Sequence, residues 1–193
     1  MFVVRNHFNT NPMEEKKRSL AMQAVIYAIF VAVAGVVFHL ILFITDLYMN
    51  RTVSFFGIII SIAGMVWGTL EYRKNYLNGF ISYGKAFTLC FLIGLFAGII
   101  SAIYMVIFAI GIHPSYTQEL MDQAREQMLT RQPDLSEDEI DQAMAISEKF
   151  MSPLPMAIMA FVMNAIYSAI LALLLGLILK KEDKSLATSS STI

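Results

Sequence analysis

The chain has 193 residues, of which 57% are hydrophobic and only 15% are charged, whereas about 25% of residues are charged in soluble domains. A formal net charge of −1 gives no general attraction to nucleic acid, and a single cysteine excludes both an intrachain disulfide and a zinc site built from cysteines. The composition therefore favours a single-domain membrane protein that does not bind nucleic acid.

The apolar residues are gathered in four long segments that contain no Asp, Glu, Lys or Arg. A helix rises about 1.5 Å per residue, so about 20 apolar residues cross a hydrocarbon core of about 30 Å. We therefore expect an all-α fold, a bundle of four transmembrane helices within a membrane domain of residues 19–181. The spans are predicted at about residues 20–45, 52–70, 86–112 and 154–179.

Polar segments flank this membrane domain at both ends. Residues 1–18 are expected to form a flexible cytoplasmic segment, in which Met13 is an alternative start. The apolar run that follows is too long for the hydrophobic region of a signal peptide and has no clear cleavage site, so we interpret it as an uncleaved first span. Residues 182–193 end in Ser-Ser-Ser-Thr-Ile and are expected to be a disordered cytoplasmic tail.

The basic residues predict the orientation of the four spans. When both termini and the loop at 71–85 are placed in the cytoplasm, ten of the fourteen Lys and Arg residues lie on that side. Cytoplasmic loops of membrane proteins carry such an excess of basic residues. The segment between the third and fourth spans is then extracytoplasmic.

That segment, residues 113–152, carries nine acidic and three basic residues and is too long to be a simple turn. Ser115 with Gln118, and Ser136 with Glu139, fit the capping-box pattern that starts a helix. Pro133 separates the two patterns. We predict two amphipathic helices packed as a hairpin outside the membrane.

Three short motifs resemble a known family. They are Gly-Phe-Ile-Ser-Tyr-Gly-Lys-Ala-Phe at 79–87, Ile-His-Pro-Ser-Tyr at 112–116 and Phe-Met-Ser-Pro at 150–153. With the four-span layout, they are similar to the uncharacterised bacterial domain-of-unknown-function family 4199, found mainly in Bacteroidetes, from about residue 20 to residue 181. His113 departs from the pattern, which has an acidic residue before the proline. The resemblance implies a protein of the bacterial inner membrane with no assigned activity, and it transfers no catalytic residue.

Small residues recur every four positions in the predicted spans, including the pairs Gly64 with Gly68 and Gly94 with Gly98. In lipid, close approach of backbones through small residues holds helices together. We expect these glycines to be helix-packing residues within one chain, and the alternative is a dimerisation face.

Four polar residues in the spans are candidates for a functional site: His39, Asn164, Tyr104 and Ser101. A polar or ionisable side chain inside a membrane is costly, so it either makes a structural hydrogen bond or serves a function. The structural role is the commoner one, and the alternative hypothesis is that these residues line a small polar cavity.

Three classes of function remain. The first is a membrane scaffold or accessory subunit that binds a protein partner through the acidic hairpin, with Glu137, Asp141 and Glu148 as candidate partner-binding residues. Its alternative is a hairpin that only packs on itself or on the bundle. The second is a small oligomeric transporter or channel that uses His39 and Asn164. The third, an enzyme, is not expected, because no nucleophile, nucleotide-binding or metal-binding motif is present. We expect no cofactor, and as partners the lipid bilayer and either another protein or a second copy of the chain.

Overall fold

The computed structural model describes residues 12–181, and for residues 12–19 and Arg51 it describes the backbone alone. Within this range the chain is helical and has no strand, which confirms the all-α prediction. An isolated antiparallel bridge joins Ile81 to Lys181. The elements in chain order are α1 (Pro12–Ile44), α2 (Arg51–Ser54), α3 (Phe56–Tyr76), α4 (Tyr83–Ile107), the π-helix η1 (Phe108–Ile112), α5 (Tyr116–Arg131), α6 (Glu137–Met151) and α7 (Pro153–Leu179).

Four helical segments are long and apolar enough to cross a membrane, as the sequence predicts. The second segment ends later than expected, since α3 continues through Glu71, Arg73 and Lys74 to Tyr76. A charged residue can extend its head group to the membrane surface from the last turns of a helix, so the first charge in the sequence marks the end of a span too early. The four candidate spans are Leu20–Ile44, Thr52–Tyr76, Tyr83–Ile112 and Pro153–Leu179.

The first helix begins earlier than the composition indicates. Helix α1 starts at Pro12, within the segment expected to be flexible, while residues 1–11 and the tail at 182–193 lie outside the described residues. Proline is favoured at the first helical position, and Glu, Lys and Arg are good helix formers with little cost in side-chain entropy. The polar character of this segment therefore places it outside the apolar span but does not prevent a helix.

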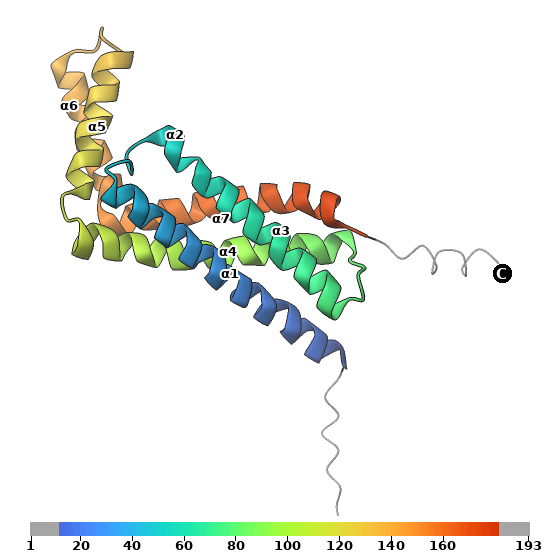
Figure 1. The fold of residues 1–193 in the computed structure, drawn as a ribbon. Helices are drawn as coiled ribbons and strands as arrows, with labels where there is room; N and C mark the ends of the chain where they lie inside the picture. The colour runs from blue at the N-terminus through green and yellow to red at the C-terminus, as the bar shows by residue number, and fades with distance from the viewer. Residues whose placement is uncertain (1–11, 182–193) are drawn as a thin grey trace, which may run out of the picture.

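Helix α4 is the centre of the bundle, with α7 and α1 packed along it and α3 packed on α1 and α4. Figure 1 shows α3 crossing obliquely in front of α7 and α4. The core is densest in the half of the bundle away from the hairpin, where Met65, Leu89, Cys90 and Ile93 are almost completely buried.

Helices α5 and α6 form the predicted hairpin, which projects from one end of the bundle (Figure 1). The α6 start has the expected capping box, because the Ser136 hydroxyl accepts from the Glu139 backbone amide while the Glu139 carboxylate accepts from the Ser136 amide. The capping box predicted at Ser115 is wrong. Ser115 has helical backbone angles, so its side chain caps no amide, and Gln118 donates instead to Asp122 at 3.1 Å.

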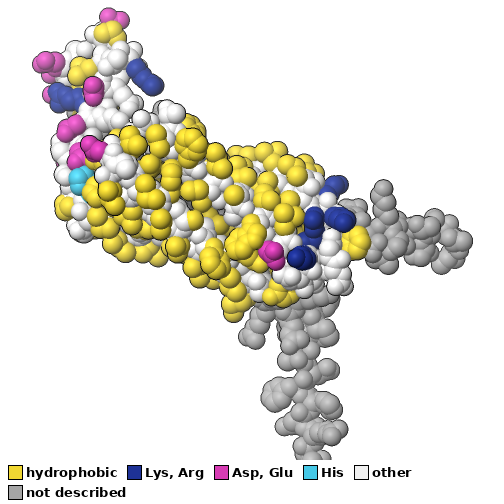
Figure 2. Space-filling view, viewed as in Figure 1, with side chains coloured by type: hydrophobic (Ala, Val, Ile, Leu, Met, Phe, Trp, Pro, Cys, Tyr) yellow, Lys and Arg dark blue, Asp and Glu magenta, His cyan; other side chains and the backbone are white. Residues whose placement is uncertain are grey.

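The two ends of the molecule differ in charge. Figure 2 shows Asp and Glu side chains over the hairpin, and a group of Lys and Arg side chains at the opposite end of the bundle. At that opposite end, Arg73 donates to the carbonyl oxygen of Leu179 at 3.0 Å, and the Lys181 ammonium lies 5.6 Å from the centre of the Phe80 ring. These contacts connect the ends of α3 and α7 to the loop before α4.

Candidate functional site

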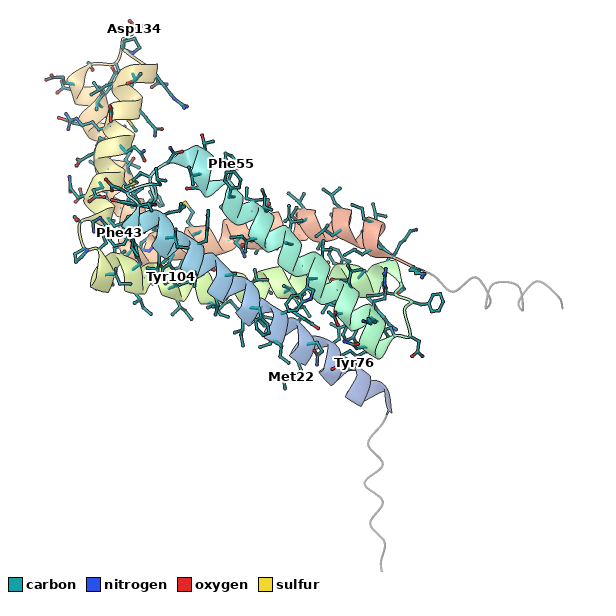
Figure 3. All side chains as sticks on the ribbon, viewed as in Figure 1. Met22, Phe43, Phe55, Tyr76, Tyr104 and Asp134 are labelled. Atoms are coloured by element: carbon teal, nitrogen blue, oxygen red, sulfur yellow. The ribbon has the colours of Figure 1, made fainter. Side chains whose placement is uncertain are left out.

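A cavity of about 370 Å³ lies between α1, α4 and α7 in the half of the bundle nearer the hairpin. His39 of α1, Ser101 and Tyr104 of α4, and Asn164 of α7 all line it, so the structure brings the four candidate polar residues to one place. Figure 3 shows the labelled Tyr104 on the stretch of α4 that leads to the hairpin.

The oblique path of α3 explains why this space is not filled. From the middle of α3 to its end, Met65, Thr69 and Tyr72 are buried against the bundle. Phe55 and Phe56, at its start, are more than half exposed. Because α3 turns away from the bundle near the hairpin, the gap between α1 and α7 above α4 stays open at that end.

One wall of the cavity is held by a pair of side chains from α1 and α4. His39 Nδ1 and the Tyr104 hydroxyl share a hydrogen bond of 2.9 Å, and the two rings meet edge to face at an angle of 81°. Phe108, one turn further along α4 and into η1, also packs edge to face against the imidazole, with ring centres 4.8 Å apart. The Nδ1 contact and the two ring contacts fix the imidazole plane beside the cavity.

The inner end of the cavity is formed where α7 meets a glycine of α4. The Asn164 amide donates to the Gly94 carbonyl oxygen at 3.0 Å and lies directly on Gly98, where a Cβ atom would collide with it. One turn further along, Ser168 and Met65, both 1% exposed, occupy the space beside Gly94. The cavity therefore ends near the middle of the bundle.

The other two predicted packing glycines make close contacts of the same kind. A Cβ atom on Gly64 would meet Val31, and one on Gly68 would lie 2.8 Å from the Tyr27 ring. These contacts join α3 to α1 within one chain. The absence of a side chain at all four glycines is thus used for packing inside this bundle.

A second polar cluster lies at the outer end of the cavity. The Tyr48 hydroxyl, from the loop between α1 and α2, donates to the carboxylate of Glu119 on α5. His113 Nε2 lies 2.9 Å from the other carboxylate oxygen and 3.3 Å from the Tyr48 hydroxyl. Tyr48 and the first residue of α5, Tyr116, also line the cavity. The cluster therefore connects the loop, the hairpin and the cavity.

The hydrogen bonds of this cluster shift two pKa values. Those from Tyr48 and His113 hold the pKa of the Glu119 carboxyl below its usual range, because they stabilise the charged form. Donation to that carboxylate raises the pKa of Tyr48 to about 12. The sequence does not indicate this cluster, because Tyr48 and Glu119 are 71 positions apart and His113 stands out only as a departure from the family motif.

The three candidate partner-binding residues lie on one stripe of α6. Glu137, Asp141 and Glu148 are exposed, and Asp141 forms an ion pair of 3.2 Å with Arg125 of α5. Figure 3 shows Asp134 at the tip of the same hairpin. Within residues 12–181, no group of three or more His, Cys, Asp or Glu side chains is arranged to hold a metal ion.

A protein-family model matches most of the chain. The model of the family described as "Protein of unknown function (DUF4199)" matches residues 26–181. The chain belongs to this family. The matched region of this DUF4199 protein includes the four cavity residues, the Tyr48 cluster and the whole hairpin. No curated protein and no solved structure matches the chain.

Proposed function

We propose that this DUF4199 protein is a small transporter, oligomeric in the membrane, that binds a solute in the cavity between α1, α4 and α7. The observation that carries the proposal is that polar side chains from three apolar helices, among them His39, Tyr104 and Asn164, line one cavity. Placing such groups inside a membrane is costly, and where they converge they mark a path or a binding site for a solute.

The depth of the cavity supports a carrier over an open channel. The cavity begins near Tyr48 and Ser54 and ends at Asn164, beyond which Met65 and Ser168 fill the bundle. A binding site near the middle of the membrane is the arrangement that alternating-access carriers use. The proposal needs no catalytic residue or cofactor, so the protein is taken to bind and move its solute unchanged.

The test uses two cysteines at similar depth on α4, in a Cys90→Ser background. Ser101→Cys faces the cavity, while Ile103→Cys, at a position 57% exposed, faces an apolar surface. We expect a charged methanethiosulfonate reagent, added to membranes, to label Ser101→Cys and not Ile103→Cys, because only a thiol in contact with water ionises and reacts. Equal labelling, or none at Ser101→Cys, contradicts the proposal.

We further propose that the protein lies in the bacterial inner membrane, with both termini in the cytoplasm and the hairpin outside. The support is the excess of basic residues on the side of the termini, at the end of the bundle opposite the hairpin. Single cysteines at Ser136 and Ser189, without Cys90, are probed with an impermeant thiol reagent on spheroplasts. We expect labelling at Ser136 only, and labelling at Ser189 only would reverse the orientation.

A second candidate function, that of a scaffold or accessory subunit, is favoured by the exposed acidic stripe of α6. The stripe is outside the candidate spans and exposed, although Asp141 also pairs with Arg125, so a partner protein with a basic surface can reach it. Replacing Glu137, Asp141 and Glu148 by Lys reverses its charge. Loss of cross-linked neighbours in a folded triple variant supports docking. A stable variant that keeps every neighbour of the parent shows that the stripe is only solvated.

A further inference from the structure

The walls of the cavity restrict the kind of solute that it accepts, provided that the proposed function is right. Five rings line the cavity: His39, Tyr48, Tyr104, Tyr116 and Phe161. Several are already held in contact, for example Tyr48 and Tyr116 with ring centres 6.2 Å apart. Rings fixed in this way present flat, polarisable surfaces, and another ring stacks on such surfaces or meets their edges.

The charge of the walls is a second restriction. None of the side chains that line the cavity belongs to Asp, Glu, Lys or Arg. A charged ligand would lose its hydration on entry without gaining a counter-charge, at a large cost in free energy. The cavity therefore disfavours anions such as carboxylates.

A few neutral polar groups remain to orient a ligand. The His39 imidazole uses Nδ1 for Tyr104, and the Asn164 amide uses one N–H for the Gly94 carbonyl oxygen. The Ser101 hydroxyl and the remaining capacity of His39 and Asn164 can bond a carbonyl or a hydroxyl group. A volume of about 370 Å³ falls within the range of about 300–1,000 Å³ for sites that enclose small molecules.

We propose that the cavity binds an uncharged, planar ring compound that carries a carbonyl or hydroxyl group. The ring packs against the aromatic wall near the hairpin, and the polar group lies toward Ser101 and Asn164. This arrangement gives the polar groups of the walls a hydrogen-bond partner and brings no charge into the cavity.

Coumarin, an uncharged bicyclic ring with one carbonyl, is the first probe, and coumarin-3-carboxylate is its charged counterpart. Binding is measured by titration calorimetry on the full chain in lipid nanodiscs. Gly35 lines the cavity, and a Cβ atom there meets nothing within 4 Å, so Gly35→Leu adds bulk at a wall position where the start of a side chain has room. Val37→Leu, at a position 50% exposed on the same helix, is the control for added bulk.

We expect saturable binding of coumarin to the parent and to Val37→Leu, and binding at least about tenfold weaker for coumarin-3-carboxylate and for Gly35→Leu. Equal binding of the carboxylate, or no loss in Gly35→Leu, overturns the inference. The two proposals are separated by protection of Ser101→Cys from the charged methanethiosulfonate reagent. If glycerol protects the thiol while coumarin does not, the cavity does not select planar ring compounds, and the proposed transporter function stands. If Ser101→Cys is never labelled, both fail.

Discussion

Replacing Glu119 by Gln should weaken the attachment of the hairpin to the bundle. Its carboxylate accepts from the Tyr48 hydroxyl and lies 2.9 Å from His113 Nε2, so it ties α5 to the loop before α2. Glutamine keeps the shape and one acceptor oxygen but loses the charge. The structure therefore predicts that Glu119→Gln destabilises the protein without disturbing the four spans.

The magnitude follows from the charge and the exposure of Glu119. A hydrogen bond to a charged group contributes about 1.5–3 kcal/mol. The side chain of Glu119 is 36% exposed, so hydrogen bonds to water replace part of the stabilisation that the variant loses. We expect the free energy of unfolding to fall by about 1–2 kcal/mol, which for a chain of this size lowers the unfolding midpoint by roughly 2–8 °C.

The pH dependence has a definite sign. The pKa of Glu119 is lowered in the folded protein from an ordinary value of 4.5, so its contribution is present above that pH and is lost as the pH falls through the lower value. The loss in the free energy of unfolding caused by Glu119→Gln should therefore be full at about pH 7 and become smaller below pH 4.5. The contribution of Tyr48, whose pKa is raised to about 12, should be present below pH 10 and lost as the pH rises through about 12.

The assay is thermal unfolding of the detergent-solubilised protein, followed by circular dichroism. Glu126→Gln, at an exposed position on the same helix, removes the same charge and serves as the control. Tyr48→Phe should lower the midpoint as well, and the double variant should lose less than the sum of the two single variants because the residues share one bond. Equal midpoints for Glu119→Gln and Glu126→Gln at about pH 7 would refute the reasoning.

Three further outcomes follow from the packing and the caps. Gly98→Ile should lower the thermal aggregation midpoint more than Ile99→Ala does. The new isoleucine side chain would collide with Asn164, whereas the side chain of Ile99 is 40% exposed. Equal midpoints would contradict the contact between Gly98 and Asn164. Ser136→Ala should speed hydrogen exchange at the first amides of α6 and Ser136→Asp should not, since aspartate also caps a helix; equal rates would argue against the cap. Cys90 is fully buried, so an uncharged maleimide should react with it only after unfolding, and rapid reaction of the native protein would show that this part of the core opens.

The sequence predicted the helices well because the hydrocarbon core of a bilayer offers the backbone no hydrogen-bond partners. Every backbone amide must be bonded within the membrane, so a charge-free apolar segment of sufficient length has to be helical. The Ser136 cap was equally predictable, because its partner Glu139 is three residues away. Ser115 fits the same pattern but caps no amide, because its backbone is helical and not in the extended conformation that a capping residue adopts.

The candidate site could be predicted only in part. The sequence shows which polar residues lie in the apolar segments, namely His39, Ser101, Tyr104 and Asn164. It does not show which groups form hydrogen bonds with them. In a soluble helix the apolar stripe shows which face is buried. A membrane helix is apolar on all sides, so its sequence gives little indication of which residues face inward.

The sequence by itself determined the number of helices able to cross a membrane, the hairpin between the third and fourth of them, and the glycines available for close packing. These features depend on composition and on neighbours a few residues apart. The tertiary structure alone decided that His39 meets Tyr104 and that Asn164 lies on Gly98. It also decided that Glu119 joins Tyr48, and that a cavity remains where α3 diverges from α7. The physical reason is that these contacts depend on the tilt and rotation of whole helices, which are set by packing against neighbouring helices.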